Sequence, residues 1–78
     1  NQYTGVATEI FTQAVEAIKE DVRAIRQKDP QNAQAIKARE NKRENQFAWL
    51  GMAEILYARH QYTEAEAYFK KALAVDPN

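Results

Sequence analysis

The 78-residue chain has no cysteine, one histidine, two glycines and two prolines. The lack of cysteine excludes disulfide bonds and thiolate metal sites, and a single histidine leaves too few ligands for a structural zinc ion. Neither charge dominates, because 11 Lys and Arg residues balance 11 Asp and Glu residues. This balance favours neither nucleic acid nor an anionic membrane as a partner. No apolar run approaches the ~20 residues of a membrane-spanning helix, so we expect no membrane insertion.

The residues that are present favour helix. Hydrophobic residues make up 45% of the chain, many of them alanine, and Ala, Glu, Gln, Lys and Arg are strong helix formers. We therefore predict an all-α fold in one helical domain over residues 1–78. The sequence begins without an initiator Met or a signal peptide, so we expect a fragment of a longer protein. The lack of cysteine is compatible with the cytoplasm and the periplasm alike.

Helix breakers divide the chain into three predicted helices, over residues 4–28, 31–59 and 63–75. In the first, apolar residues recur every three or four positions and form one stripe, which consists of Val6, Ile10, Phe11, Ala14, Val15, Ile18, Val22 and Ile25. Asp29 and Pro30 predict a tight turn, with Asp29 as the N-cap of the next helix.

The second stretch, residues 31–59, is predicted as one continuous helix, and the alternative is two helices joined in the polar segment 37–46. From Phe47 onward this stretch is apolar on all sides, which indicates a helix covered by at least two neighbours. At the start of the third helix, Thr63 and Glu66 match the spacing of a capping box.

A recurring series of aromatic, small and apolar residues occupies the last part of the chain: Trp49, Met52, Ala53, Leu56, Tyr62, Ala65, Phe69, Ala72 and Pro77. With this series, residues 46–78 resemble one tetratricopeptide repeat, a helix–turn–helix unit of about 34 residues. Met52, Ala53 and Leu56 stand where the family pattern has Leu, Gly and Tyr, and the other six match directly. His60 stands at the glycine of the family's turn, so we expect a slightly strained turn or one held by the imidazole.

The breakers and the turn at Asp29 and Pro30 predict an antiparallel three-helix arrangement, and the resemblance implies that its last two helices form a hairpin. It also implies a non-catalytic module that binds protein or peptide on a concave surface. The matching positions of that surface are Phe47, Leu50, Glu54, Tyr57 and Ala58. These residues are not the Lys, Asn and Arg with which some members grip a C-terminal carboxylate. The alternative is that the first helix covers this surface through Ile10 and Phe11.

An antiparallel first pair of helices would place Phe11 near Phe47 and Leu50. The same pairing sets Val15, Ile18 and Val22 against the charged segment 39–46, which offers little to bury them. Each of these side chains would contribute roughly 1.5–3 kcal/mol when fully buried. The mismatch therefore predicts self-association through these three residues, as a two-fold homodimer.

The sequence indicates no catalytic, cofactor-binding or metal-binding residues. His60 has no assignable acid or nucleophile and is interpreted as a turn residue. A basic run is interpreted as a solvated face because acidic residues interrupt it; it consists of Lys37, Arg39, Lys42 and Arg43. The predicted function is an adaptor or scaffold without nucleic-acid binding. The alternatives are a structural helical segment or an accessory domain of a larger enzyme or secretion apparatus.

Overall fold

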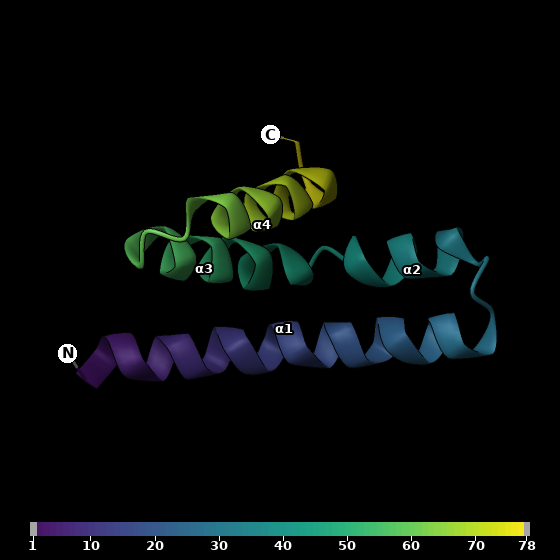
Figure 1. Cartoon of the computed structure of the whole chain (residues 1–78), viewed down its shortest axis with the longest axis horizontal. Coiled ribbons are helices and arrows are strands. Elements are labelled where there is room, and N and C mark those ends of the chain that lie inside the picture. Colours follow the sequence, from purple (N-terminus) through teal and green to yellow (C-terminus); the bar gives the residue numbers. More distant parts are fainter. Residues whose placement is uncertain (1, 78) are drawn as a thin grey trace.

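The computed structural model describes residues 2–77 and, among residues 2–4 and 6, the backbone only. It contains the helices α1 (Gln2–Lys28), α2 (Ala33–Glu40), α3 (Asn45–Ala58) and α4 (Tyr62–Val75). The long α1 runs antiparallel to α2 and α3, and α4 lies on the other side of α3 (Figure 1). The all-α class and the hairpin of the last two helices are confirmed. Val6 of the predicted apolar stripe lies outside the described side chains.

The turn after α1 differs from its prediction in one detail. The helix ends at Lys28, because Pro30 keeps the residue before it out of the helical region. Asp29 does not cap α2, however, because its carboxylate accepts the backbone N–H of Gln31 at 3.3 Å, still within the turn. The N-cap is Asn32, whose side-chain oxygen accepts the backbone N–H of Ala35 at 3.0 Å. The helix therefore begins at Ala33.

The continuous helix predicted over residues 31–59 is wrong, and so is the count of three helices. The chain leaves the helix at Asn41 and re-enters it at Asn45. The amide of Asn45 donates to the backbone carbonyls of Arg39 at 2.5 Å and of Glu40 at 3.2 Å. The indole N–H of Trp49 donates to the same Glu40 carbonyl at 2.9 Å. These bonds satisfy the last carbonyls of α2 from outside the helix, which replaces the bonds that a continuous helix would have made.

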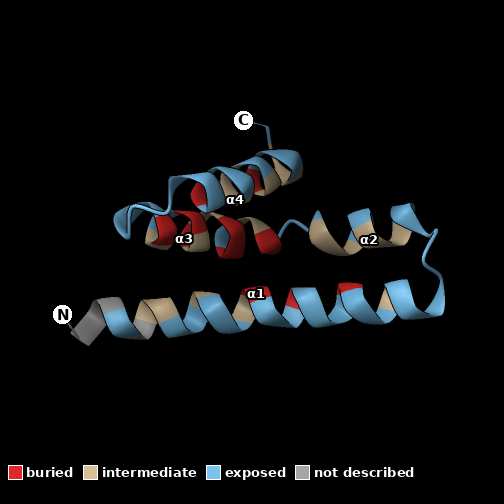
Figure 2. Ribbon diagram, viewed as in Figure 1, coloured by how far each residue is buried: buried red, intermediate tan, exposed pale blue. Residues whose placement is uncertain are grey.

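The core lies where α3 meets α1 and α4, and Figure 2 shows the buried positions concentrated on α3 and on the side of α1 that faces it. Trp49 is its largest member, and only 1% of this residue is exposed. Its ring stacks at a tilt on Tyr68 of α4, with the ring centres 5.8 Å apart. The remaining members of the cluster are Val15, Ile18, Val22, Ala48 and Ala72. As predicted for a helix apolar on all sides, α3 is covered by two neighbours.

At the turn between α3 and α4, helix α3 is followed by a residue in the left-handed conformation. The backbone N–H of Gln61 donates to the carbonyl of Leu56, and that of His60 donates to the carbonyl of Tyr57. This pair of bonds is the Schellman arrangement, which needs a positive φ at the residue after the cap. His60 has a φ of 64° there. Its Nδ1 lies 2.7 Å from the Tyr62 hydroxyl, so the turn combines the two alternatives expected for it, a left-handed residue and an imidazole contact.

The predicted capping box at the start of α4 is wrong. Because the left-handed turn closes so tightly, α4 begins at Tyr62, and Gln61 is its N-cap without a side-chain bond. Thr63 is therefore already inside the helix. Glu66 pairs with Lys70 one turn later, at 3.3 Å, instead of reaching back to the cap.

Candidate functional site

One face of α3 stays open between the helices that cover its other faces. Phe47 is 75% exposed and Tyr57 is 59% exposed, although both belong to the most apolar helix of the chain. Leu50 is half-buried between them, and Glu54 is exposed. The four residues recur at steps of three and four, so they form one stripe along the helix, which we call the α3 ridge. These are the positions that sequence reasoning selected for partner binding.

The first helix covers the neighbouring face of α3 rather than the ridge. The ring of Phe11 lies so close to Gly51 that a side chain on this glycine would collide with it. Ile10, the other residue expected to cover the ridge, is itself 57% exposed. The first helix therefore covers this surface only in part: Phe11 packs at its edge on Gly51, whereas Ile10 does not cover it and Phe47 and Tyr57 stay exposed. Phe11 approaches α3 at Gly51, directly beside the predicted contact at Leu50.

A shallow groove accompanies the ridge between the N-terminal part of α1 and the C-terminal part of α3. Its volume is about 490 Å³ and its lining is mostly apolar, contributed by Ala7, Thr8, Phe11, Gly51, Glu54, Ile55, Ala58 and Arg59. Glu54 belongs to both the groove and the ridge, so the two features form one continuous surface. The charged groups Glu54 and Arg59 bring opposite signs to it. Such a surface offers apolar contacts along its length and one charge of each sign for orientation.

The three residues predicted to form a self-association surface lie in the core instead. Val15, Ile18 and Val22 are each at most 6% exposed and cluster with Trp49, Ala48 and Ala72. The premise that these side chains face only charged residues was wrong for two reasons. The charged segment 41–44 leaves the helical path, and the side chain of a helical residue such as Trp49 points back toward the N-terminus of its helix. The chain therefore covers its own stripe.

The repeat-packing residues divide into a buried group and a peripheral group. Ala53, Leu56, Ala65 and Ala72 are buried with Trp49, which fits small residues that allow α3 and α4 to approach closely. Met52 and Phe69 are half-buried. Tyr62 is exposed and contacts Tyr57 edge-on across the turn, with ring centres 5.1 Å apart. Pro77 is exposed beyond the end of α4.

Sequence reasoning missed the role of Asn45, the one buried polar residue among the side chains that the structure describes. Its amide holds the break between α2 and α3, as described above. Arg39, part of the run interpreted above as a solvated basic face, has a structural role next to Asn45. Its side chain is 20% exposed and pairs with Asp21 of α1 at 2.6 Å. An Asn after a polar, charged run was the available signal, because Asn favours helix ends over helix interiors.

Two other kinds of feature are absent from the part of the chain that the structure describes. No group of three or more His, Cys, Asp or Glu side chains within residues 2–77 could hold a metal ion. Among the helices that the structure describes, none combines the length and the apolar character needed to cross a membrane.

Comparison with known proteins supports the repeat resemblance of the last part of the chain. Residues 47–78 match the model of the tetratricopeptide repeat family. These residues span α3, its turn and α4, so the chain carries a tetratricopeptide-like repeat in a helical protein. No curated protein and no solved structure matches the chain. Repeats of this family indicate a protein–protein interaction module and are generally non-catalytic.

Proposed function

We propose that the chain is a single helical domain that works as a non-catalytic adaptor or scaffold and binds a protein segment on the α3 ridge. The exposure of Phe47 and Tyr57 is the observation that supports this function. Two aromatic side chains 75% and 59% exposed on the most apolar helix gain contact area only when a partner covers them. Aromatic residues also dominate binding energy at protein interfaces, because they bury large areas at small entropic cost.

The chemistry of the surface selects the partner. The apolar groove beside the ridge accepts aliphatic or aromatic side chains, and Glu54 and Arg59 can orient a segment that carries one charge of each sign. We therefore propose an amphipathic peptide segment whose apolar side covers Phe47, Leu50 and Tyr57.

Self-association stays a prediction, but the surface proposed for it is now the α3 ridge. Because Val15, Ile18 and Val22 are buried within one chain, a homodimer has no uncovered stripe there to close. The α3 ridge is the apolar surface available for a second copy. The structural-segment and accessory-domain alternatives also stay open, since both are compatible with the same ridge.

A peptide selection tests the proposal. A phage-displayed peptide library is panned on the immobilised chain, and binding of an enriched peptide is then measured by fluorescence polarisation. Replacing Phe47 and Tyr57 together with Ser should weaken binding by about tenfold or more, as expected for interface anchors. The matched control replaces Ile10 and Leu73 together with Ser, because both are exposed apolar residues that lie outside the ridge and its groove.

The control variant should bind like the unmodified chain. Equal loss in both variants, or a selection that enriches no peptide, would contradict the proposal. Sedimentation equilibrium on the same samples shows whether a second copy occupies the ridge. If the unmodified chain is a dimer that dissociates in the Phe47/Tyr57 variant, the partner of the ridge is a second copy of the chain and not a peptide.

A further inference from the structure

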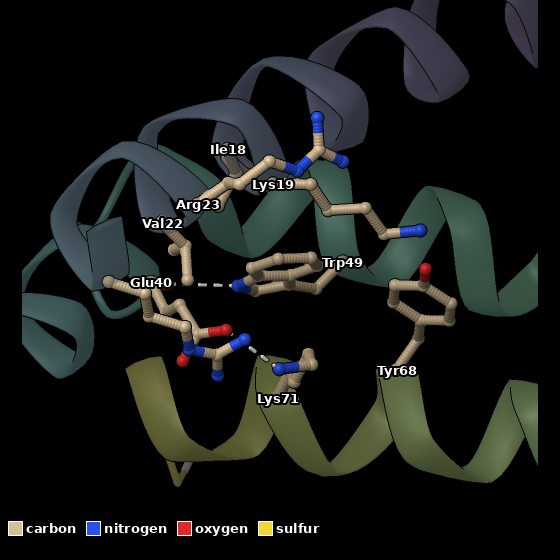
Figure 3. A pocket seen from close by; sticks show the side chains of 9 residues that line it. Ile18, Lys19, Val22, Arg23, Glu40, Trp49, Tyr68 and Lys71 are labelled. Carbon is tan, nitrogen blue, oxygen red and sulfur yellow. Dashed lines mark hydrogen bonds and ion pairs between the residues drawn. The ribbon is translucent and has the colours of Figure 1, made fainter. Parts of the chain in front are cut away.

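A second groove lies between α1 and α4, and its lining residues are distinct from those of the ridge groove. Its volume is about 380 Å³, which is in the range of binding pockets. Figure 3 shows the indole of Trp49 between the α1 side chains on one side and Tyr68 and Lys71 of α4 on the other. Ile18 and Val22 complete the apolar floor. The floor is therefore built largely from buried members of the core cluster.

The rim of this groove is strongly basic. Lys19, Arg23, Arg26 and Lys71 line it, and Glu40 is the single carboxylate beside them. The groove thus carries a formal charge of three positive in a chain whose net charge is zero. Because the chain as a whole is neutral, this excess of positive charge is a property of the groove and not of the whole molecule.

The cations differ in how far the chain already neutralises them. Lys71 pairs with Glu40 at 2.9 Å, and its ammonium also lies 5.2 Å from the centre of the Trp49 ring. Within residues 2–77, by contrast, no carboxylate lies within ion-pair distance of Arg23 or Arg26. These two guanidinium groups can accept an external carboxylate without giving up an existing ion pair.

Lys19 adds a third cation that points into the same groove (Figure 3). Interaction with the Tyr68 side chain raises the pKa of Lys19 above its ordinary value, and burial opposes this effect without reversing it. Its ammonium lies 5.9 Å from the Tyr68 ring centre and 3.7 Å from the exposed carboxylate of Glu16. The group therefore stays charged at the edge of the aromatic floor.

The positions of these cations along α1 are close enough to the spacing of an extended chain for their long side chains to reach it. Lys19, Arg23 and Arg26 follow one another at steps of four and three residues, which is about 6 Å and then about 4.5 Å along the helix axis. In an extended peptide, side chains two residues apart lie on the same side, about 6.6–6.8 Å from each other. Acidic residues at alternate positions of a peptide can thus meet successive cations. A zero net charge and so short a basic stripe do not favour a nucleic acid.

We propose that the α1–α4 groove binds an acidic peptide segment in extended conformation, with carboxylates on Arg23, Arg26 and Lys19 and an apolar side chain over Tyr68. This site lies apart from the α3 ridge and goes beyond the proposed function. The chain would then hold two different protein segments, an amphipathic one on the ridge and an acidic one in the groove.

The tryptophan in the groove makes the proposal measurable, because Trp49 is the only one in the chain. The probe is the synthetic peptide acetyl-Glu-Phe-Glu-Gly-Glu-amide, and its neutral counterpart carries Gln in place of each Glu. Titration of the acidic peptide should change the emission of Trp49, and the affinity should fall as salt is added, because the rim cations are exposed to screening. The neutral peptide should produce no saturable change.

Two variants with the same change in charge locate the effect. Replacing Arg23 and Arg26 with Gln should weaken binding of the acidic peptide by about tenfold, since two partly exposed charge contacts are removed. The control replaces Lys37 and Lys42, which are exposed and outside the groove, with Gln. It should change the affinity less than about twofold, because salt screens the effect of surface charges outside the groove. Circular dichroism checks that both variants keep the helical signal.

Several results would overturn the proposal. They are a wild-type chain that does not respond to the acidic peptide at about 1 mM, equal losses in the two charge variants, and equal binding of the neutral peptide. Displacement of the acidic peptide by a single-stranded oligothymidylate at lower concentration would reassign the groove to nucleic acid. A Phe47/Tyr57 double serine variant should bind the acidic peptide normally, so failure of the ridge proposal leaves this test intact.

Discussion

The two sides of α3 are made from similar residues and have opposite surroundings. On one side Trp49, Ala53 and Leu56 are buried against α1 and α4. On the other side Phe47 and Tyr57 project from the same fourteen-residue helix, largely uncovered. Apolar character alone therefore does not distinguish a core position from a binding position. The difference comes from which neighbours the chain places beside each face.

The closed side depends on contacts that reach across the break between α2 and α3. The Glu40 carbonyl receives the Trp49 indole, and the Glu40 carboxylate receives Lys71 of α4 at 2.9 Å. One residue at the end of α2 thus connects to both helices of the repeat. The open side has no such cross-connection among the described residues, apart from the contact of Tyr57 with Tyr62. Changes on the closed side should therefore affect folding far more than changes on the open side.

The largest effect is expected from truncation of Trp49. Trp49→Ala removes the centre of the core and the donor to the Glu40 carbonyl. Loss of a buried aromatic side chain typically lowers the free energy of unfolding by about 3–5 kcal/mol. Urea titration followed by circular dichroism measures this change. A loss below about 1 kcal/mol would show that the closed side is not the core of the chain.

A smaller loss is expected at the helix break. Asn45→Ala leaves the Arg39 carbonyl without its side-chain donor and the Glu40 carbonyl with the indole alone. An unsatisfied, partly buried carbonyl costs about 1–3 kcal/mol. The same urea titration measures the cost. The control is Asn41→Ala, because Asn41 caps α2 through its backbone N–H and has an exposed side chain. A more stable Asn45→Ala chain would indicate that α2 and α3 join into one helix when the amide is removed.

The smallest effect is expected at the turn, and it has the opposite sign. His60→Gly should raise the free energy of unfolding by about 0.5–1 kcal/mol, because glycine adopts a positive φ without the strain that a side chain brings. The gain is reduced by loss of the exposed contact with the Tyr62 hydroxyl. Tyr62→Phe removes that contact alone and serves as the control. A destabilised His60→Gly chain would mean that the imidazole contact outweighs the backbone strain.

The sequence predicted most of the helices because their signals are local. The apolar stripe and Pro30 define α1, and the small and aromatic residues from Ala65 to Ala72 define the face of α4. The approximate pairing of α1 with α3 was also predictable, since an antiparallel pair around one turn places Phe11 near Leu50 and Gly51. The exposed ridge followed from the family positions rather than from apolar character.

The break after α2 was only the alternative interpretation of the polar segment 37–46, and the cover of the core was missed. The sequence alone did not select the break over one continuous helix, because both features depend on side chains that act over distance. The helix stops where Asn45 and Trp49 donate to its last carbonyls, and that arrangement exists only once the chain has folded back. The same break lets the indole reach over Val15 and Val22, so the expected mismatch with charged residues does not arise. The α1–α4 groove was missed for a related reason, since Trp49, Tyr68 and Lys71 come from helices remote in sequence from the three cations of α1.

One measurement tests directly whether the chain covers one face of α3 and leaves the other open. Val15→Asp and Phe47→Asp introduce the same charge on the two sides, at positions 1% and 75% exposed. Circular dichroism and sedimentation equilibrium are recorded on both variants and on the unmodified chain. We expect Val15→Asp to lose the helical signal, because the free-energy cost of burying an unpaired charge exceeds the free energy of unfolding of so small a domain. We expect Phe47→Asp to keep it. A Val15→Asp chain that stays fully helical, whether or not its mass falls, would contradict this account.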